Sequence, residues 1–233
     1  MNWKDNIKDW YQVASKTNKE TKVPLDKNFK SHMIKPCSMI SIVGSTGSGK
    51  STALLEFLNR KNESFYRIIV FSGSTTDEPL YNLLKTKLDG VEFVDDVDKL
   101  PELNDTYGED DKLEKLIVFD DFINLKPKEK NKIQKWFNSA RKKNWTCIAM
   151  IQNYTDAPIQ MRRNTMYWLI FRLNDMNTIN TILKNHNNNG DDKEKVKKMY
   201  FDCTSQPKHF FTLDLTPCTP ARYRHCFTDI IKI

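Results

Sequence analysis

Runs of apolar residues alternate along the chain with polar segments in which apolar residues recur at helical spacing. Strands are predicted at residues 39–43, 67–72, 91–94, 116–119, 145–151, 166–171 and 209–214. Helices are predicted between them, at residues 53–58, 79–88, 128–143, 175–186 and 193–200. Strands that are apolar throughout and alternate with helices are typical of a parallel sheet covered on both faces. The pattern therefore predicts an α/β fold with a mostly parallel central sheet flanked by helices.

The two ends of the chain follow other patterns. One face of a predicted N-terminal helix carries Trp3, Ile7, Trp10, Tyr11 and Ala14, and a lysine-rich connector follows it. We expect a helical N-terminal arm and linker over residues 1–36, and one domain over residues 37–233 that is long enough to bury its own core. The tryptophans of the arm need a surface on which their rings can be buried, either on this domain or on a neighbouring subunit. Residues 216–233 give no clear pattern.

The strand at residues 39–43 leads into a glycine-rich turn and then directly into a helix. The turn and the start of the helix consist of Gly44, Ser45, Thr46, Gly47, Ser48, Gly49, Lys50, Ser51 and Thr52. This order of elements is typical of a phosphate-binding P-loop, in which backbone N–H groups and the positive end of the helix dipole face the anion. A nucleoside triphosphate is therefore the expected ligand. Lys50 would reach its β- and γ-phosphates, and the Ser51 hydroxyl would hold Mg²⁺.

Two carboxylates follow the apolar strand at residues 116–119. The carboxyl ends of parallel strands are where open α/β sheets bind ligands, so Asp120 and Asp121 are expected near the P-loop. Downstream of a P-loop this is a Walker B pattern, in which Asp120 holds Mg²⁺ through water and Asp121 polarises the attacking water. A strand end that caps a helix would look similar. The P-loop upstream favours the catalytic interpretation.

Further polar residues flank the strand at residues 145–151. Gln152 ends this strand, where it would orient water beside the γ-phosphate, although a glutamine that only meets solvent gives the same pattern. Arg141 precedes the strand, and Arg162 and Arg163 follow it. An arginine that reaches the γ-phosphate of a neighbouring subunit acts as an arginine finger. The residues alone do not choose among these three.

The charge of the chain is uneven. The net charge is +7, but residues 89–114 carry eleven acidic side chains against two lysines, a balance of −9 that leaves +16 on the remainder. A basic body favours a polyanionic partner such as nucleic acid, because binding releases counterions from the phosphates. A solvated basic surface without a partner would show the same composition.

The cysteines and histidines add no further chemistry at this stage. The five cysteines are scattered, and His32, His186, His209 and His225 lack the spacing of metal ligands. We therefore expect no disulfide framework and no metal site other than that for Mg²⁺. No apolar run approaches the ~18 residues of a membrane span, and the N-terminus has no apolar signal core, so an intracellular protein is expected.

Taken together, the motifs resemble those of DNA-packaging ATPases of nucleocytoplasmic large DNA viruses, polinton-like elements and virophages, the viral branch of the FtsK/HerA superfamily. The resemblance spans residues 36–214, with the virophage type nearest. It rests on the P-loop, the strand that ends at Asp120 and Asp121, and the stretches SARKKNWTCIAMIQN and APIQMRRNTMYWLIFR. It implies a RecA-like P-loop NTPase core that uses ATP and Mg²⁺. It also implies a homo-oligomeric ring around double-stranded DNA, sequence-independent translocation into a preformed capsid, and capsid proteins as partners.

The resemblance also assigns roles and a location. Lys50 and Ser51 hold phosphates and Mg²⁺, Gln152 is the sensor, and Arg141 is the better candidate for the finger. One position departs from the family, because many members have glutamate in the place of Asp121, whose side chain is one methylene shorter. This difference puts the catalytic reach of Asp121 in question. The implied location is the host cytoplasm, in a viral factory, or the virion.

Two other functions fit a P-loop. A small-molecule kinase of the nucleoside type would need an acceptor pocket and an arginine-bearing lid, and it would not need an acid pair and a polar sensor on separate strands. A nucleotide-gated assembly scaffold with little turnover is kept open by the short side chain of Asp121.

Overall fold

The computed structural model describes residues 23–61, 64–73, 79–87, 90–103, 112–186, 190–217 and 219–232. The predicted N-terminal helix that contains Trp3 and Trp10 lies outside these residues. The described part of the arm begins at residue 23 and contains one short helix, α2 (Phe29–His32).

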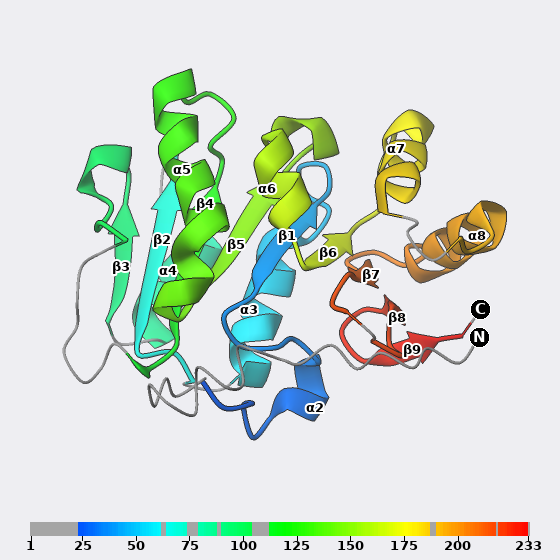
Figure 1. Cartoon of the computed structure of the whole chain (residues 1–233), viewed down its shortest axis with the longest axis horizontal. Helices are drawn as coiled ribbons and strands as arrows, with labels where there is room; N and C mark the ends of the chain where they lie inside the picture. The colour runs from blue at the N-terminus through cyan, green and yellow to red at the C-terminus, as the bar shows by residue number, and fades with distance from the viewer. Residues whose placement is uncertain are drawn as a thin grey trace, which may run out of the picture.

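A nine-stranded sheet forms the centre of the molecule, in the order β3-β2-β4-β5-β1-β6-β7-β8-β9 (Figure 1). The parallel strands are β1 (Met39–Val43), β2 (Arg67–Ser72), β3 (Val91–Val94), β4 (Lys115–Asp120), β5 (Trp145–Ile151) and β6 (Tyr167–Ile170). Antiparallel pairing adds β7 (Phe211–Asp214), β8 (Tyr223–His225) and β9 (Asp229–Ile231). The predicted mostly parallel sheet is confirmed. Strand β5 lies between β1 and β4, so three strand ends with polar residues are neighbours.

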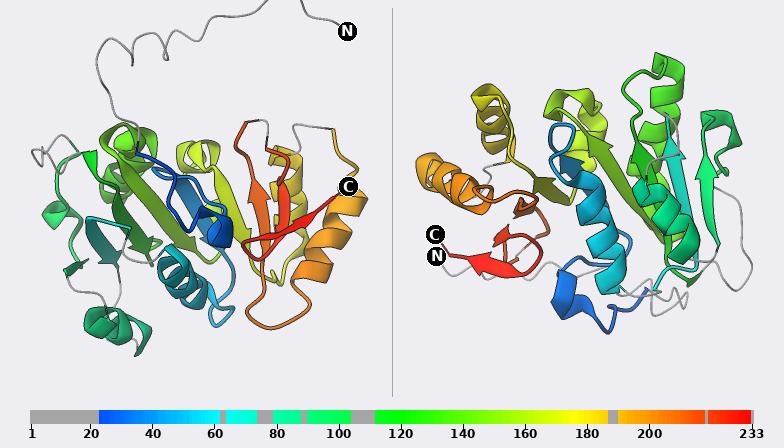
Figure 2. Two further views of the ribbon diagram at one scale, coloured as in Figure 1. Left: turned by 90° about the horizontal axis from the view of Figure 1, so that it is seen from below. Right: turned by 180° about the vertical axis from the view of Figure 1, so that it is seen from behind.

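Helices cover both faces of the sheet (Figures 1 and 2). One face packs against α3 (Lys50–Lys61) and α4 (Pro79–Lys87). The other packs against α5 (Pro127–Ser139), α6 (Ile159–Asn164), α7 (Met176–His186) and α8 (Lys193–Cys203). Successive side chains of a strand point to opposite faces, so Phe119 packs in the core beside Trp136 of α5, whereas Val118 packs in the core with Leu54 of α3. This double burial explains why the strands are apolar throughout.

Three features differ from the sequence prediction. The predicted helix at residues 128–143 ends as α5 at Ser139 and continues as a short 3₁₀ helix, η3 (Ala140–Lys143). Helix α6 was not predicted, and residues 216–233 contain β8 and β9. In β8, Arg224 is 1% exposed, donates to the Met33 carbonyl at 3.0 Å and lies 3.6 Å from the Asp214 carboxylate. A buried, paired arginine in a three-residue strand gives no apolar pattern to recognise.

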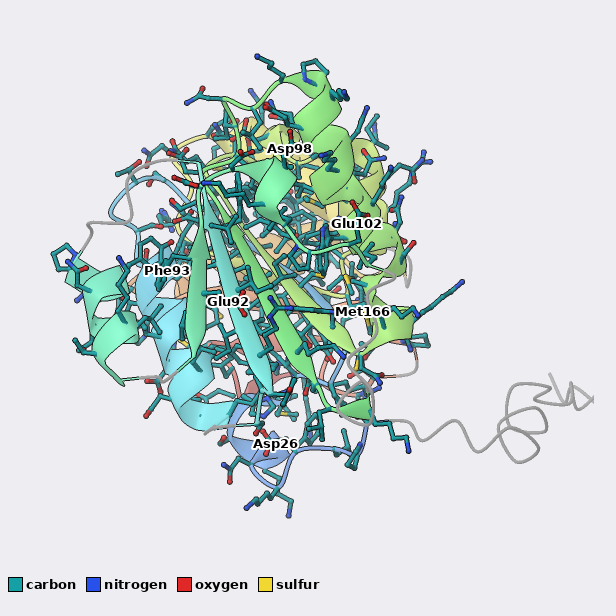
Figure 3. The ribbon with its side chains drawn as sticks, turned by 90° about the vertical axis from the view of Figure 1, so that its left-hand side faces the viewer. Asp26, Glu92, Phe93, Asp98, Glu102 and Met166 are labelled. Carbon is teal, nitrogen blue, oxygen red and sulfur yellow. The ribbon has the colours of Figure 1, made fainter. Side chains whose placement is uncertain are left out.

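Residues 90–103 of the acidic segment lie at the β3 edge of the sheet, where Figure 3 shows Glu92, Asp98 and Glu102. Arg67 of β2 donates to Glu92 at 2.5 Å, and Lys132 of α5 pairs with Asp98. Exposed pairs of this kind are screened by solvent and contribute little to stability. The acidic edge is therefore partly neutralised by its own neighbours.

Glu114, the last acidic residue of that segment, is buried. It forms an ion pair with Lys61, which is 2% exposed, and accepts a hydrogen bond from the Cys37 N–H at 3.0 Å. A buried charge is tolerated when it is paired and hydrogen-bonded. The pair joins the end of α3 to the residue before β4. It therefore lies at the amino ends of the parallel strands, opposite to their carboxyl ends.

Within the described residues, no helix has the length and the apolar composition needed to cross a bilayer.

Candidate nucleotide-binding site

The glycine-rich turn forms a tight loop between β1 and α3. Gly47 and Gly49 have φ angles of +78° and +111°, which side chains other than glycine rarely adopt. Gly44 is required for a different reason, since a Cβ there would lie 2.5 Å from Ser48 Oγ and 2.7 Å from the Phe171 Cβ. The predicted strand, loop and helix are therefore present, and the glycines have the conformations that turn a backbone around an anion.

Lys50 begins α3, and its ammonium group lies inside the loop. Its Nζ donates to the Gly44 carbonyl at 2.7 Å and to the Ser45 carbonyl at 3.1 Å. The following residue, Ser51, lies in the first turn of the same helix, where the positive end of the helix dipole favours an anion. Cationic and backbone donors thus converge on one point.

The two carboxylates stand where the sequence predicts them. Asp120 is the last residue of β4, and Asp121 follows it with a φ of +47°. Aspartate tolerates this left-handed conformation better than most residues do. The turn ends the strand at once and places both carboxylates at its carboxyl end.

Two residues near this pair were missed by the sequence analysis. The Tyr81 hydroxyl, from α4, donates a hydrogen bond to Asp120. Gly73 follows β2, its N–H donates to the Asp120 carbonyl at 3.1 Å, and a Cβ there would overlap the Asp121 carbonyl. Tyr81 carried no signal beyond its place in a predicted helix. Gly73 directly after a predicted strand was a signal of close backbone approach.

Gln152 follows the last residue of β5 and is exposed. The start of the P-loop is tied to this strand end, because the Gly44 N–H donates to the Ile151 carbonyl at 3.2 Å. In the sheet register, Asp120 of β4 is opposite Met150 of β5. The carboxylates after β4 and the P-loop after β1 therefore lie on either side of the β5 end that carries Gln152.

These groups line one cavity of about 460 Å³. Its lining residues are Thr46, Gly47, Gly49, Lys50, Ser51, Thr52, Asp120, Asp121, Ile123, Met150, Gln152 and Lys208. Ligand pockets in proteins commonly enclose about 300–1,000 Å³. The sequence prediction that P-loop, acid pair and Gln152 meet in space is thus consistent with this geometry, while the catalytic roles stay predictions.

Lys208 is the charged lining residue that the sequence did not indicate. It precedes β7, has a φ of +65°, and its Cα lies 3.2 Å from where a Cβ of Gly49 would be. Gly49 is thus needed both for its own φ and for this contact. No local pattern around Lys208 predicts the contact, because it depends on the pairing of β7 with β6, far along the chain.

The three candidate finger arginines do not line this cavity. Arg141 lies in η3, which precedes β5, whereas Gln152 follows β5. The two residues are therefore at opposite ends of this strand. Arg162 and Arg163 belong to α6 and line a separate cavity of about 340 Å³. The Arg162 guanidinium lies 4.8 Å from the centroid of the Tyr154 ring. A role for any of them at a γ-phosphate would therefore require a second subunit.

The donor set fits a triphosphate with a divalent cation. Lys50 and Lys208 bring positive charge to the cavity, and Asp120 and Asp121 bring negative charge. The Ser48 hydroxyl is buried and has no hydrogen-bond partner among the described residues, which fits a loop built to meet an additional acceptor. Oxygen ligands such as Ser51 and Asp120 are those that Mg²⁺ prefers.

A sequence model of the AAA domain family matches residues 33–156, which is more than half of the chain. The matched segment contains the P-loop, both carboxylates and Gln152, and it ends well before Lys208. No curated protein sequence matches the chain.

Solved structures of a viral protein share the fold. The genome packaging NTPase B204 from Sulfolobus turreted icosahedral virus 2, in complex with AMPPCP, is 16% identical with a TM-score of 0.57, and the alignment covers 83% of this chain and 98% of that one. Its complex with sulfate is 17% identical with a TM-score of 0.55 and covers 86% and 100%. B204, the DNA-packaging ATPase from Sulfolobus Turreted Icosahedral Virus, is 16% identical with a TM-score of 0.55 and covers 83% and 98%. At these identities the likeness shows the P-loop NTPase fold.

Proposed function

This chain belongs to the AAA domain family, and we propose that it is an ATP-driven motor that moves double-stranded DNA into a preformed viral capsid. One observation carries the proposal: a P-loop, two carboxylates from β4 and a glutamine from β5 line a single cavity. Nucleotide binding needs only the P-loop. Hydrolysis also needs groups that hold the metal ion and the attacking water, and the carboxylates and the glutamine are suited to these roles.

The P-loop would hold the phosphates of ATP. Backbone N–H groups of the loop would face the phosphate oxygens, and Lys50 would exchange its contacts with the Gly44 and Ser45 carbonyls for the β- and γ-phosphates. Lys208, which packs against Gly49, lines the same cavity and adds a second positive charge.

The two carboxylates at the end of β4 would have different roles, one at the metal ion and one at the attacking water. Ser51 and Asp120 would hold Mg²⁺, which when bound neutralises phosphate charge, and the Tyr81 hydroxyl would keep Asp120 in place. Asp121 would accept a proton from the attacking water, and Gln152 would orient that water. The positive φ of Asp121 sets the direction of its short side chain, on which this role depends.

The DNA part of the proposal is supported by charge and by the related fold. Outside residues 89–114 the chain carries +16, and exposed cations lie on and after α5, such as Lys128, Lys135, Arg141 and Lys142. Contacts of lysine and arginine to phosphates bind duplex DNA without reading its sequence, and they weaken steeply as salt rises. The B204 proteins that share this fold are described as genome-packaging and DNA-packaging enzymes.

A ring of subunits is the second part of the proposal. No candidate arginine lines the cavity of its own chain, so a finger would come from a neighbour, as arginine fingers supplied in trans do. We place such a ring around DNA in the host cytoplasm or at the capsid, with capsid proteins as partners.

The test is hydrolysis of ATP by the purified chain with and without long duplex DNA. We expect phosphate release that DNA stimulates, and ring-shaped particles in electron micrographs when ATP and DNA are both present. Transfer of phosphate to a nucleoside would identify a kinase instead. Tight ATP binding without release of phosphate would identify a scaffold.

A further inference from the structure

A cluster of nitrogen and sulfur ligands lies outside the nucleotide cavity, at the β7–β8 pair. His209, His225 and Cys226 each offer one ligand atom, and these atoms lie within 4.8 Å of one another. Nδ1 of His209 and Nε2 of His225 are 2.8 Å apart. All three side chains are partly exposed, so an ion from solution can reach them. None of the three lines the cavity that holds Lys50 and Asp120.

The sheet explains why these residues meet although the sequence gives them no ligand spacing. Strand β7 begins at Phe211 and β8 ends at His225, and the antiparallel register puts these two residues opposite each other. The Cys226 N–H donates to the Phe210 carbonyl at 2.8 Å, which extends the pairing beyond β8. The cluster is thus built on paired backbone and not on a loose loop. His209 and His225 thus meet in space although their spacing in the sequence is not that of metal ligands.

A carboxylate orients one of the imidazoles. Oδ2 of Asp229 lies 3.4 Å from Nδ1 of His225, on the side of the ring away from His209. A proton held at Nδ1 by this carboxylate leaves a lone pair on Nε2, the nitrogen that faces His209. Carboxylate partners of this kind fix the tautomer of histidines that bind metals.

We propose that the chain binds one Zn²⁺ ion through Nδ1 of His209, Nε2 of His225 and Sγ of Cys226, with the fourth position open to water. Two imidazoles and one thiolate form a ligand set that zinc accepts and that Mg²⁺ and Ca²⁺ do not. Binding would displace the proton shared by the two imidazoles and the proton of the thiol.

The two imidazole nitrogens lie close to the separation that a bound zinc ion requires. Zinc bonds of about 2.0–2.1 Å in a tetrahedral arrangement separate two nitrogens by roughly 3.3 Å, against the 2.8 Å between His209 and His225. Rotation of the two partly exposed rings would widen this gap and aim both nitrogens at the ion, and rotation of the Cys226 side chain would bring Sγ, which lies within 4.8 Å of both, toward it. The ion would fix the start of β7 to the end of β8. Because Lys208 directly precedes His209, it would also hold the loop that packs against Gly49.

The test uses the full chain after treatment with a chelator, titrated with Zn²⁺ against a chromophoric competitor and in the absence of nucleotide. We expect one equivalent of Zn²⁺ per chain, with a dissociation constant below about 1 µM. Cys226→Ser and His209→Ala should each weaken binding by at least tenfold, whereas His186→Gln, a histidine outside the cluster, should leave it unchanged.

Cobalt substitution identifies the thiolate ligand. Co²⁺ bound to the wild-type chain should show thiolate-to-metal charge-transfer absorption, and this band should be missing in Cys226→Ser. Zn²⁺ should raise the unfolding temperature of the wild type and of His186→Gln, but not that of the two ligand variants. Should Cys226→Ser fail to fold without metal, His225→Gln replaces it in the zinc titration, where it should weaken binding by at least tenfold. Absence of stoichiometric binding, or binding that is equal in all variants, would overturn the proposal. Because the titration contains no nucleotide, its outcome is independent of ATPase activity.

Discussion

The two halves of the sheet contribute to the nucleotide cavity in different ways. In the parallel half, β1, β4 and β5 each end at the same edge and each is followed by polar groups that line the cavity (Figure 1). In the antiparallel part, β7 begins at that edge, so the residues that precede it, not those that follow it, reach the cavity. Lys208 is the result.

This difference indicates a division of labour. The parallel strands place groups with defined chemistry, namely an ammonium, two carboxylates and an amide, at fixed spacing from one another. The antiparallel strands supply a contact to the P-loop backbone and one further positive charge. We therefore expect changes in the parallel half to affect turnover and changes near β7 to affect nucleotide affinity.

The largest effect is expected for Lys50→Ala in the parallel half. The loop would lose the one ammonium group that its own carbonyls position, so nucleotide binding or turnover should be abolished. ATP binding and phosphate release measure this effect, and Lys195→Ala, an exposed lysine of α8, is the matched control. Activity close to that of the wild type would remove the P-loop from the mechanism.

Arg141→Ala tests whether the parallel half is complete without a neighbour. An arginine finger supplied in trans contributes about 10³-fold or more to turnover, so the variant should be slowed by that order. Mixing Arg141→Ala with Lys50→Ala should restore part of the activity, because an intact P-loop then meets an intact arginine across a subunit boundary. No restoration, with assembly intact, would argue against Arg141 and direct attention to Arg162 and Arg163.

Asp121→Asn should separate binding from chemistry within the parallel half. We expect ATP binding to persist and hydrolysis to slow by about 10²-fold, because the amide does not accept the proton of the attacking water. Asp95→Asn, at the acidic β3 edge, is the control for an exposed acid. Normal turnover in Asp121→Asn would move the catalytic role to another residue.

The smallest effect is expected for Lys208→Ala in the antiparallel part. One exposed charge-assisted contact to a phosphate would be lost, which should raise KM for ATP about five- to tenfold with little change in kcat. Steady-state kinetics at several ATP concentrations measure this, again with Lys195→Ala as control. A fall in kcat at unchanged KM would contradict the division between the two halves.

The parallel half could be predicted from the sequence because its central strands β1, β4 and β5 are largely apolar and buried on both faces. Residues 67–72 and 145–151 were predicted with the bounds that the structure has, and the polar residues after such strands could be assigned to one edge. In the antiparallel part, β7 lies within the predicted strand at residues 209–214. Strands β8 and β9 escaped prediction because they are short and because their buried positions include Arg224. Lys208 and the pair of His209 and His225 depend on pairing between distant segments, which no local pattern encodes.

The contact between Gly49 and Lys208 has a consequence for how the protein is made. The ribosome releases the P-loop roughly 160 residues before the segment that braces its last glycine. A nascent chain that has emerged only to residue 186 already displays every recognisable motif, yet its loop still lacks that brace. We therefore expect high-affinity nucleotide binding only late in synthesis, after β7 has paired with β6.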